Sequence, residues 1–166
     1  MSVDHRLCWS TPYVRKKLIE HSLSERAVFA YFLAITTFDW LQFSLIAATP
    51  SLKVEPWMLA NAWATFGVTI AGVVYLFGRN RGGTRFMSRY FPLSVTVGWK
   101  CVVFLYALNW LIDACFADYG QTVVGWLSTA CAGVINIFMF WRIGYHLSAI
   151  ARASANREAS APPQPV

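Results

Sequence analysis

The sequence predicts an all-α membrane protein: a four-transmembrane-helix antiparallel bundle with a short N-terminal cytosolic amphipathic helix. Hydrophobic residues make up 57% of the 166 residues and charged residues only 13%, whereas soluble domains carry about one quarter charged residues. Four apolar stretches each reach the ~20 residues that cross ~30 Å of hydrocarbon. Basic residues gather between alternate stretches, which is the pattern that sets membrane topology.

Residues 1–25 are expected to form a cytosolic segment that contains a short amphipathic helix over residues 9–24. Ser10 or Thr11 is suited to cap this helix, and Pro12 suits its first turn. Val14 and Leu18 form an apolar pair one helical turn apart. We expect the basic residues of the helix to contact anionic headgroups, at about 1 kcal/mol per charge near the surface.

The transmembrane domain is predicted over residues 26–150, with short connections between its helices. Its spans are expected at about residues 27–47, 57–77, 91–116 and 122–147. Residues 151–166 follow as a tail that ends in a proline-rich stretch. This composition predicts a disordered cytosolic tail.

The distribution of Lys and Arg predicts the orientation of the chain. The N-terminal segment, the connection over residues 78–89 and the tail hold nearly all the basic residues outside the spans, and the opposite connections offer only Lys53. The positive-inside rule therefore places both termini in the cytoplasm. Because the N-terminus lacks the early apolar core of a cleavable signal peptide, we expect the first span to direct insertion, as in a bacterial inner-membrane protein.

Polar residues inside the spans are candidates for any function, because lipid-exposed polar groups are costly. The candidates are Asp39, Gln42, Asn61, Lys100, Asn109, Asp113 and Asn136. In the third span, Lys100 lies nearly opposite Asn109 and Asp113, since nine residues advance a helix by about half a turn beyond whole turns. A helix with two polar sides either sits centrally in the bundle or also contacts another subunit.

Asp39 and Lys100 are expected at similar depths, ~18 Å and ~13 Å from the cytoplasmic ends of their spans at 1.5 Å per residue. One interpretation is an ion pair that fixes helix register, with Lys100 alternatively extending to the inner interface. The other is a proton- or ion-responsive site, because titratable groups in a low dielectric shift their pKa values easily.

Small residues predict where helices pack closely. Gly67 and Ala71 in the second span, and Gly125, Thr129 and Gly133 in the fourth, allow another helix to approach. We therefore expect a homo-oligomer or a complex with another membrane protein.

The basic connection contains Arg79, Arg81, Arg85 and Arg89. It is expected either to contact acidic lipid headgroups or an acidic partner segment, or to act only as the topological signal. The net charge of +6 follows from these helix-end clusters, so the bilayer, and not nucleic acid, is the expected partner.

The sequence contains no pattern that predicts catalysis, a cofactor or a metal site. The histidines, His5, His21 and His146, do not form a pair able to hold a haem or a metal. The four cysteines include no C-x-x-C motif. We therefore expect a non-catalytic assembly, anchoring or regulatory subunit that works through helix contacts. The alternatives are an oligomeric channel or carrier component with an Asp/Lys polar path, and a membrane-embedded enzyme.

Overall fold

A computed structural model describes residues 10–20, 28–35, 37, 54–80 and 85–160. Its elements are the helices α2 (Thr11–Glu20), α4 (Pro56–Arg79), α5 (Phe86–Phe116) and α6 (Gln121–Ser160), with a short 3₁₀ helix η1 (Ala117–Tyr119). Residues 28–35 and 37 are also helical, and these described ranges contain no strand. The predicted all-α class is confirmed.

Three of the described helices, α4, α5 and α6, are long and apolar enough to cross a membrane. The shortest, α4, has 24 residues, which corresponds to about 36 Å at 1.5 Å per residue and exceeds a ~30 Å hydrocarbon core. The predicted spans 57–77, 91–116 and 122–147 all lie inside these helices. Most of the first predicted span, 27–47, lies outside the described residues, so the count of four stays a prediction.

Local chemistry explains where these helices begin and end. α4 begins at Pro56, whose fixed φ suits the first helical position. It ends at Arg79 and is capped by Asn80, whose backbone N–H donates to the carbonyls of Leu76 and Phe77. Between η1 and α6 the chain turns at Gly120, which has a φ of 87°, a value that glycine adopts without a steric penalty.

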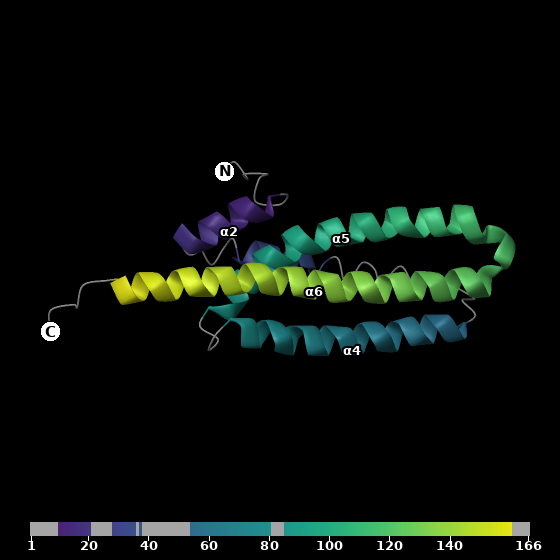
Figure 1. The fold of residues 1–166 in the computed structure, drawn as a ribbon, viewed down its shortest axis with the longest axis horizontal. Helices are drawn as coiled ribbons and strands as arrows, with labels where there is room; N and C mark the ends of the chain where they lie inside the picture. Colours follow the sequence, from purple (N-terminus) through teal and green to yellow (C-terminus); the bar gives the residue numbers. More distant parts are fainter. Residues whose placement is uncertain (1–9, 21–27, 36, 38–53, 81–84, 161–166) are drawn as a thin grey trace.

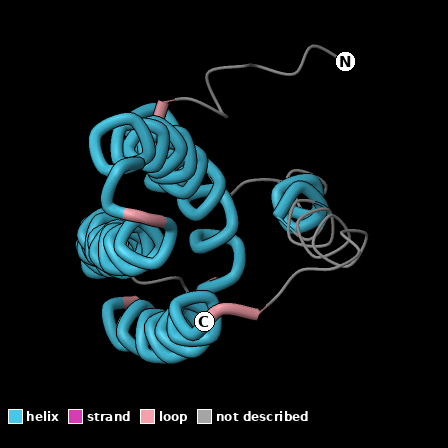
Figure 2. Tube along the Cα trace, turned by 90° about the vertical axis from the view of Figure 1, so that its right-hand side faces the viewer, coloured by secondary structure: helices cyan, strands magenta, loops and turns pink. Residues whose placement is uncertain are grey.

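α6 lies between α4 and α5, so that the three long helices form one layer (Figures 1 and 2). α4 runs parallel to α6, because Trp57 lies at Gly125 and Arg79 reaches Ser148. α5 runs antiparallel to α6, and the Sδ of Met139 lies 3.7 Å from the position of a Cβ on Gly98. The chain direction thus alternates from α4 to α6, with the parallel pair in direct contact.

Aromatic rings lie directly on glycines where α4 meets α6. The Trp57 ring occupies the space of a Cβ on Gly125, and the Phe140 ring does the same at Gly72. A third contact places Tyr75 against Gly144. Only glycine leaves room for a ring this close to the backbone, so these contacts bring the two helices together.

The buried apolar core lies where α2 packs on α5 and α6. Val14 and Leu18 of α2 are buried there. They share one cluster with Leu76, Phe86, Leu93, Val97, Phe140, Ile143, Leu147 and Ile150. Burial of an aliphatic side chain of this size contributes about 1.5–3 kcal/mol, so α2 is held to the bundle by its apolar pair.

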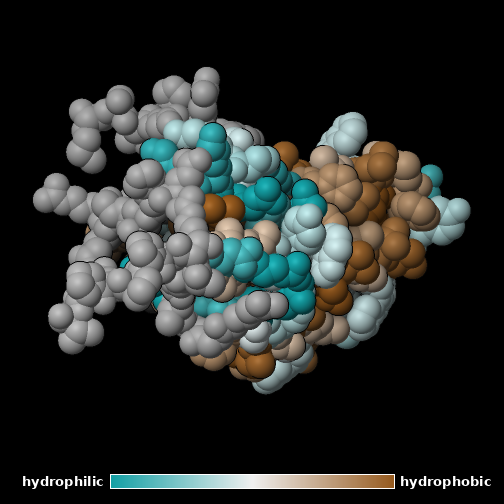
Figure 3. Space-filling model, turned by 60° about the vertical axis from the view of Figure 1, so that its left-hand side comes forward, coloured by the Kyte–Doolittle hydropathy of each residue, from teal (hydrophilic) through white to brown (hydrophobic). Residues whose placement is uncertain are grey.

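Away from this core, the long helices expose large apolar side chains. Examples are Trp63, Phe66, Ile70, Phe104, Trp110, Phe138 and Trp141. In Figure 3 this hydrophobic surface covers the part of the molecule opposite α2, whereas hydrophilic residues gather around α2 and the adjoining helix ends. An exposed apolar band of this kind matches a surface that faces lipid.

The C-terminal segment differs from the prediction of a disordered tail from residue 151. α6 continues through Ser160, so residues 151–160 are helical. Ile150 and Ala151 are buried, and four of the residues from 151 to 160 are alanine, the best helix former. A helix already nucleated extends by one hydrogen bond per residue, which explains the continuation. Residues 161–166 lie outside the described part of the chain.

Gly72→Ala is expected to lower the free energy of unfolding by about 1–3 kcal/mol, because its methyl group meets the Phe140 ring and overpacks the interface. Gly67→Ala is the matched control, since a Cβ there meets nothing within 4 Å. Alanine favours the helix, so this control is expected to be as stable as the parent or more so. Unfolding by sodium dodecyl sulfate in mild-detergent micelles, followed by circular dichroism, measures both. Equal effects would contradict the α4–α6 contact.

Candidate functional site at the basic half of the bundle

Charged side chains are separated along the bundle. The half that contains α2, the end of α4, the start of α5 and the C-terminal part of α6 is called the basic half. It holds the described cations Arg15, Lys16, Lys17, Arg79, Arg85, Arg89, Lys100, Arg142 and Arg152. Of the carboxylates whose side chains are described, Glu55, Asp113 and Asp118 lie toward the opposite end, whereas the backbone positions of Glu20 in α2 and Glu158 in α6 lie in the basic half. The described residues therefore place an electropositive surface at one end of a long apolar bundle.

Arg89 connects three elements in the basic half. Its Nη1 donates to Oδ1 of Asn80 at 3.1 Å, and its Nη2 donates to Oγ of Ser154 at 3.0 Å. Asn80 follows α4 and is only 1% exposed. The guanidinium thus joins the end of α4, the start of α5 and the C-terminal part of α6.

Arg79 adds a second link between α4 and α6. Its Nη2 donates to Oγ of Ser148 at 3.3 Å. Its Cζ lies 5.9 Å from the centroid of the Tyr75 ring, within the range of a cation–π contact. Two arginines of the predicted headgroup-binding connection therefore make contacts inside the chain.

The other two arginines of that connection differ in position. Arg85 is exposed and adopts a left-handed backbone conformation with a φ of 56°, and its carbonyl accepts a hydrogen bond from Oγ of Ser88 at 2.8 Å. Arg81 lies outside the described residues. Among the described arginines of the connection, Arg79 and Arg85 are exposed and Arg89 is half-buried.

Lys100 connects α5 to α2. Its Nζ donates to Oγ1 of Thr11 at 3.1 Å, and Thr11 is buried. The proposed partner Asp39 and the nearby Gln42 lie outside the described residues, so the Asp39–Lys100 pair stays a prediction. The contact with Thr11 shows that the lysine side chain extends toward α2 and the basic half.

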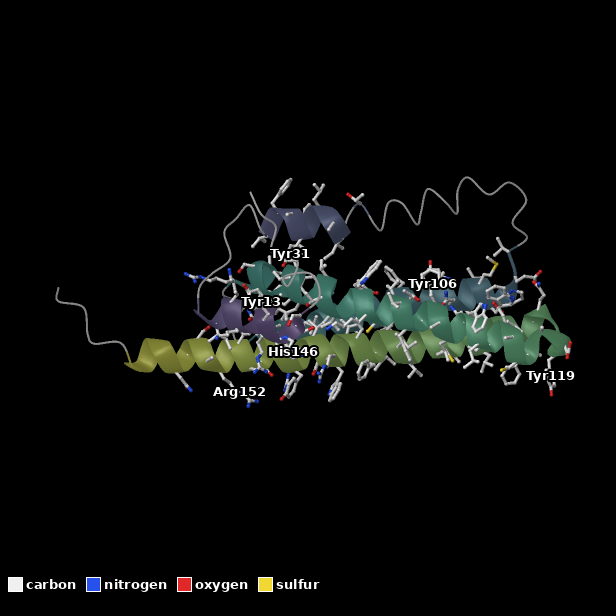
Figure 4. All side chains as sticks on the ribbon, turned by 90° about the horizontal axis from the view of Figure 1, so that it is seen from above. Tyr13, Tyr31, Tyr106, Tyr119, His146 and Arg152 are labelled. Atoms are coloured by element: carbon white, nitrogen blue, oxygen red, sulfur yellow. The ribbon has the colours of Figure 1, made fainter. Side chains whose placement is uncertain are left out.

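His146 is one of the buried polar side chains of this region. It is 5% exposed, and neither ring nitrogen has a hydrogen-bond partner in the structure. It lies on the stretch of α6 against which α2 packs (Figure 4). The sequence contained one signal for this arrangement, namely the spacing of Arg142 and His146 by one helical turn.

The remaining polar candidates are dispersed along the helices. Asn61, Asn109 and Asn136 are half-buried, and Asp113 is exposed. The Oδ1 of Asn109 is buried without a hydrogen-bond partner. Within the described part of the chain, these four side chains make no hydrogen bond to one another.

The predicted packing residues divide into two sets. Gly125 and Thr129 lie against Trp57, whose carbonyl accepts a hydrogen bond from Oγ1 of Thr129 at 3.3 Å. In contrast, a Cβ on Gly67 or Gly133 meets nothing within 4 Å, and Ala71 is exposed. The additional close contacts are at Gly72 and Gly144, which were absent from the candidates taken from the sequence.

The described ranges contain no group of three His, Cys, Asp or Glu side chains able to hold a metal ion. Within them, Cys101, Cys115 and Cys131 are free thiols. No protein-family model, curated protein or solved structure matches this chain. Its function is therefore argued from its own residues.

Arg89→Met is expected to lower the free energy of unfolding by about 1–3 kcal/mol, because buried Asn80 loses a hydrogen-bond donor. Arg152→Met removes the same charge from an exposed position of α6 and is expected to change stability by less than about 0.5 kcal/mol. Detergent unfolding titrations measure both variants. A loss of equal size in the two would show that net charge, and not the Arg89 contacts, sets stability.

Proposed function

We propose that this chain is a multi-pass inner-membrane protein that acts as a non-catalytic assembly, anchoring or regulatory subunit. It works by packing α4 against a helix of a second copy or of another membrane protein. The observation that carries the proposal is an exposed stripe of small residues on α4, formed by Ala64, Gly67 and Ala71.

The small-residue stripe lies on one flank of α4. At 100° per residue, its three positions fall within about 60° of one another. They lie between the side of α4 that contacts α6, marked by Trp57 and Gly72, and the side that carries bulky apolar residues. A second helix on this flank would therefore approach the α4 backbone without displacing the α4–α6 contact.

Helix association in lipid favours such a stripe. Lipid tails are as apolar as the helices, so association depends on close packing and on hydrogen bonds between helices. The open space at Gly67 permits the backbone approach that such packing requires. No described residue of this chain packs on this flank, so the flank is available to a helix of a partner.

Two polar side chains on α5 give further support. Asn109 and Asp113 lie one helical turn apart, and the described part of the chain supplies no hydrogen bond to either side chain. Polar groups in a membrane helix usually face protein partners or water-filled space. The exposed Asp113 carboxylate is accessible to a donor from a partner helix.

The charge separation supports the orientation of the subunit. By the positive-inside rule, the basic half faces the cytoplasm. α2 and the C-terminal part of α6 both lie in this half, so both termini are cytoplasmic.

Ala64→Leu is expected to reduce co-purification of the partner at least tenfold, because the larger side chain fills the small-residue stripe. Ala62→Leu makes the same change at another exposed position of α4, about 160° around the helix from Ala64, and is expected to retain the partner. The tagged full chain is extracted from its native membrane in mild detergent, and bound proteins are quantified by mass spectrometry.

Detection of a stoichiometric second protein or a defined homo-oligomer supports the subunit role. A monodisperse monomer in both variants and the parent contradicts it, as does equal retention of the partner by Ala64→Leu and Ala62→Leu. Circular dichroism of each variant verifies that the helices are intact.

A further inference from the structure

Three cations from three different helices lie near the place where α2 packs on α5 and α6 in the basic half. Arg15 lies on α2, Lys100 on α5, and Arg142 on α6, one helical turn before the buried His146. Lys100 and Arg142 are exposed and Arg15 is half-buried. The Lys100–Thr11 hydrogen bond ties α2 to α5 beside them. The cations are therefore held near one another by tertiary packing.

No carboxylate with a described side chain lies near these cations; Glu20 of α2 and Asp39, the predicted partner of Lys100, have side chains outside that description. The carboxylates whose side chains the structure describes, Glu55, Asp113 and Asp118, all lie toward the other end of the bundle. The ring nitrogens of His146 are enclosed without a hydrogen-bond partner. A buried polar group in this condition is costly unless a ligand or water completes its hydrogen bonds. The three cations and the unpaired ring nitrogens of His146 therefore lie in the same region of the basic half.

The depth of the cluster in the bundle indicates the chemistry of its ligand. Residues 121–141 of α6 carry no charge, and at 1.5 Å per residue they are about 31 Å long. This length equals the hydrocarbon thickness of a bilayer. Arg142, which follows at once, therefore lies at the boundary where lipid phosphates are found.

We propose that Arg15, Lys100 and Arg142 form a binding site for the phosphate of an anionic phospholipid in the cytoplasmic leaflet. The two exposed cations contact the phosphate oxygens, and Arg15 completes the positive field from α2. His146 stays buried on α6 beside these cations. The site rests on the proposed membrane orientation and is independent of any partner protein.

The structure distinguishes this site from the connection arginines that the sequence singled out. Arg79 and Arg89 are hydrogen-bonded to Ser148, Asn80 and Ser154. Lys100 reaches Thr11 of α2, and Arg142 directly follows the uncharged segment of α6. This position at the hydrocarbon boundary favours a lipid phosphate over a soluble acidic segment.

The test measures the thermal stability of the purified full chain in neutral detergent during titration with dioleoylphosphatidylglycerol. Dioleoylphosphatidylcholine and inorganic phosphate are titrated in parallel. We expect the anionic lipid to raise the melting temperature at concentrations at which the other two have no effect. The combined change Lys100→Gln with Arg142→Gln is expected to raise the lipid concentration at half-effect about 25-fold, at roughly fivefold per charge.

The matched control combines Lys17→Gln with Arg152→Gln, which removes the same net charge from two exposed positions. It is expected to shift the half-effect concentration by less than about twofold, since an effect of one unit charge is local. A second pair on α2 compares Arg15→Gln, expected to weaken binding about fivefold, with Lys17→Gln alone. This pair decides the outcome if the Lys100/Arg142 variant fails to fold.

Equal weakening in site and control variants would overturn the proposal, because it would indicate diffuse electrostatic attraction. An equal response to phosphatidylcholine would also overturn it. A full response to inorganic phosphate would assign the site to a free anion, and a stronger response to a polyglutamate peptide would assign it to an acidic protein segment. Either result contradicts a lipid site.

Discussion

The close approach of α4 to α6 over glycines is the contact on which the rest of the described structure depends. In lipid, apolar side chains gain little by leaving the solvent, so helices associate where their surfaces fit closely. Trp57, Phe140 and Tyr75 each occupy the space that a side chain would fill on a glycine of the facing helix. Because these contacts occur near both ends of α4, they set its register and direction along α6.

This pairing positions the polar contacts of the basic half. With α4 parallel to α6, Arg79 comes level with Ser148, and Asn80 reaches Arg89 at the start of α5. α6 then lies between its two neighbours, and α2 covers its junction with α5 (Figure 1). The other half of the bundle, opposite α2, has few buried side chains and a wide hydrophobic surface. The same packing therefore concentrates protein contacts at one end and leaves the other to lipid.

The three long helices could be predicted because the length of an apolar stretch can be read without knowing which helices lie beside it. The small residues that pack against protein could not be predicted in this way: Gly125 meets Trp57, whereas Gly67 and Gly133 remain open. A glycine permits an approach, but the ring that fills the space comes from another helix. Likewise, the partner of Lys100 in the described structure is Thr11, separated by 89 positions. The extension of α6 to Ser160 follows the burial of Ile150 and Ala151, which the composition of the tail does not show.

Disulfide formation between Gly72→Cys and Phe140→Cys tests the α4–α6 contact most directly. The native cysteines are replaced by serine, and a protease site is inserted after Gly82, so that cleavage separates α4 from α6 unless a disulfide joins them. Oxidation in native membranes is expected to keep the two fragments together until reductant is added. The control pair, Gly67→Cys with Phe140→Cys, is expected to release them. Release of both pairs under oxidising conditions would contradict the proposed packing of the two helices.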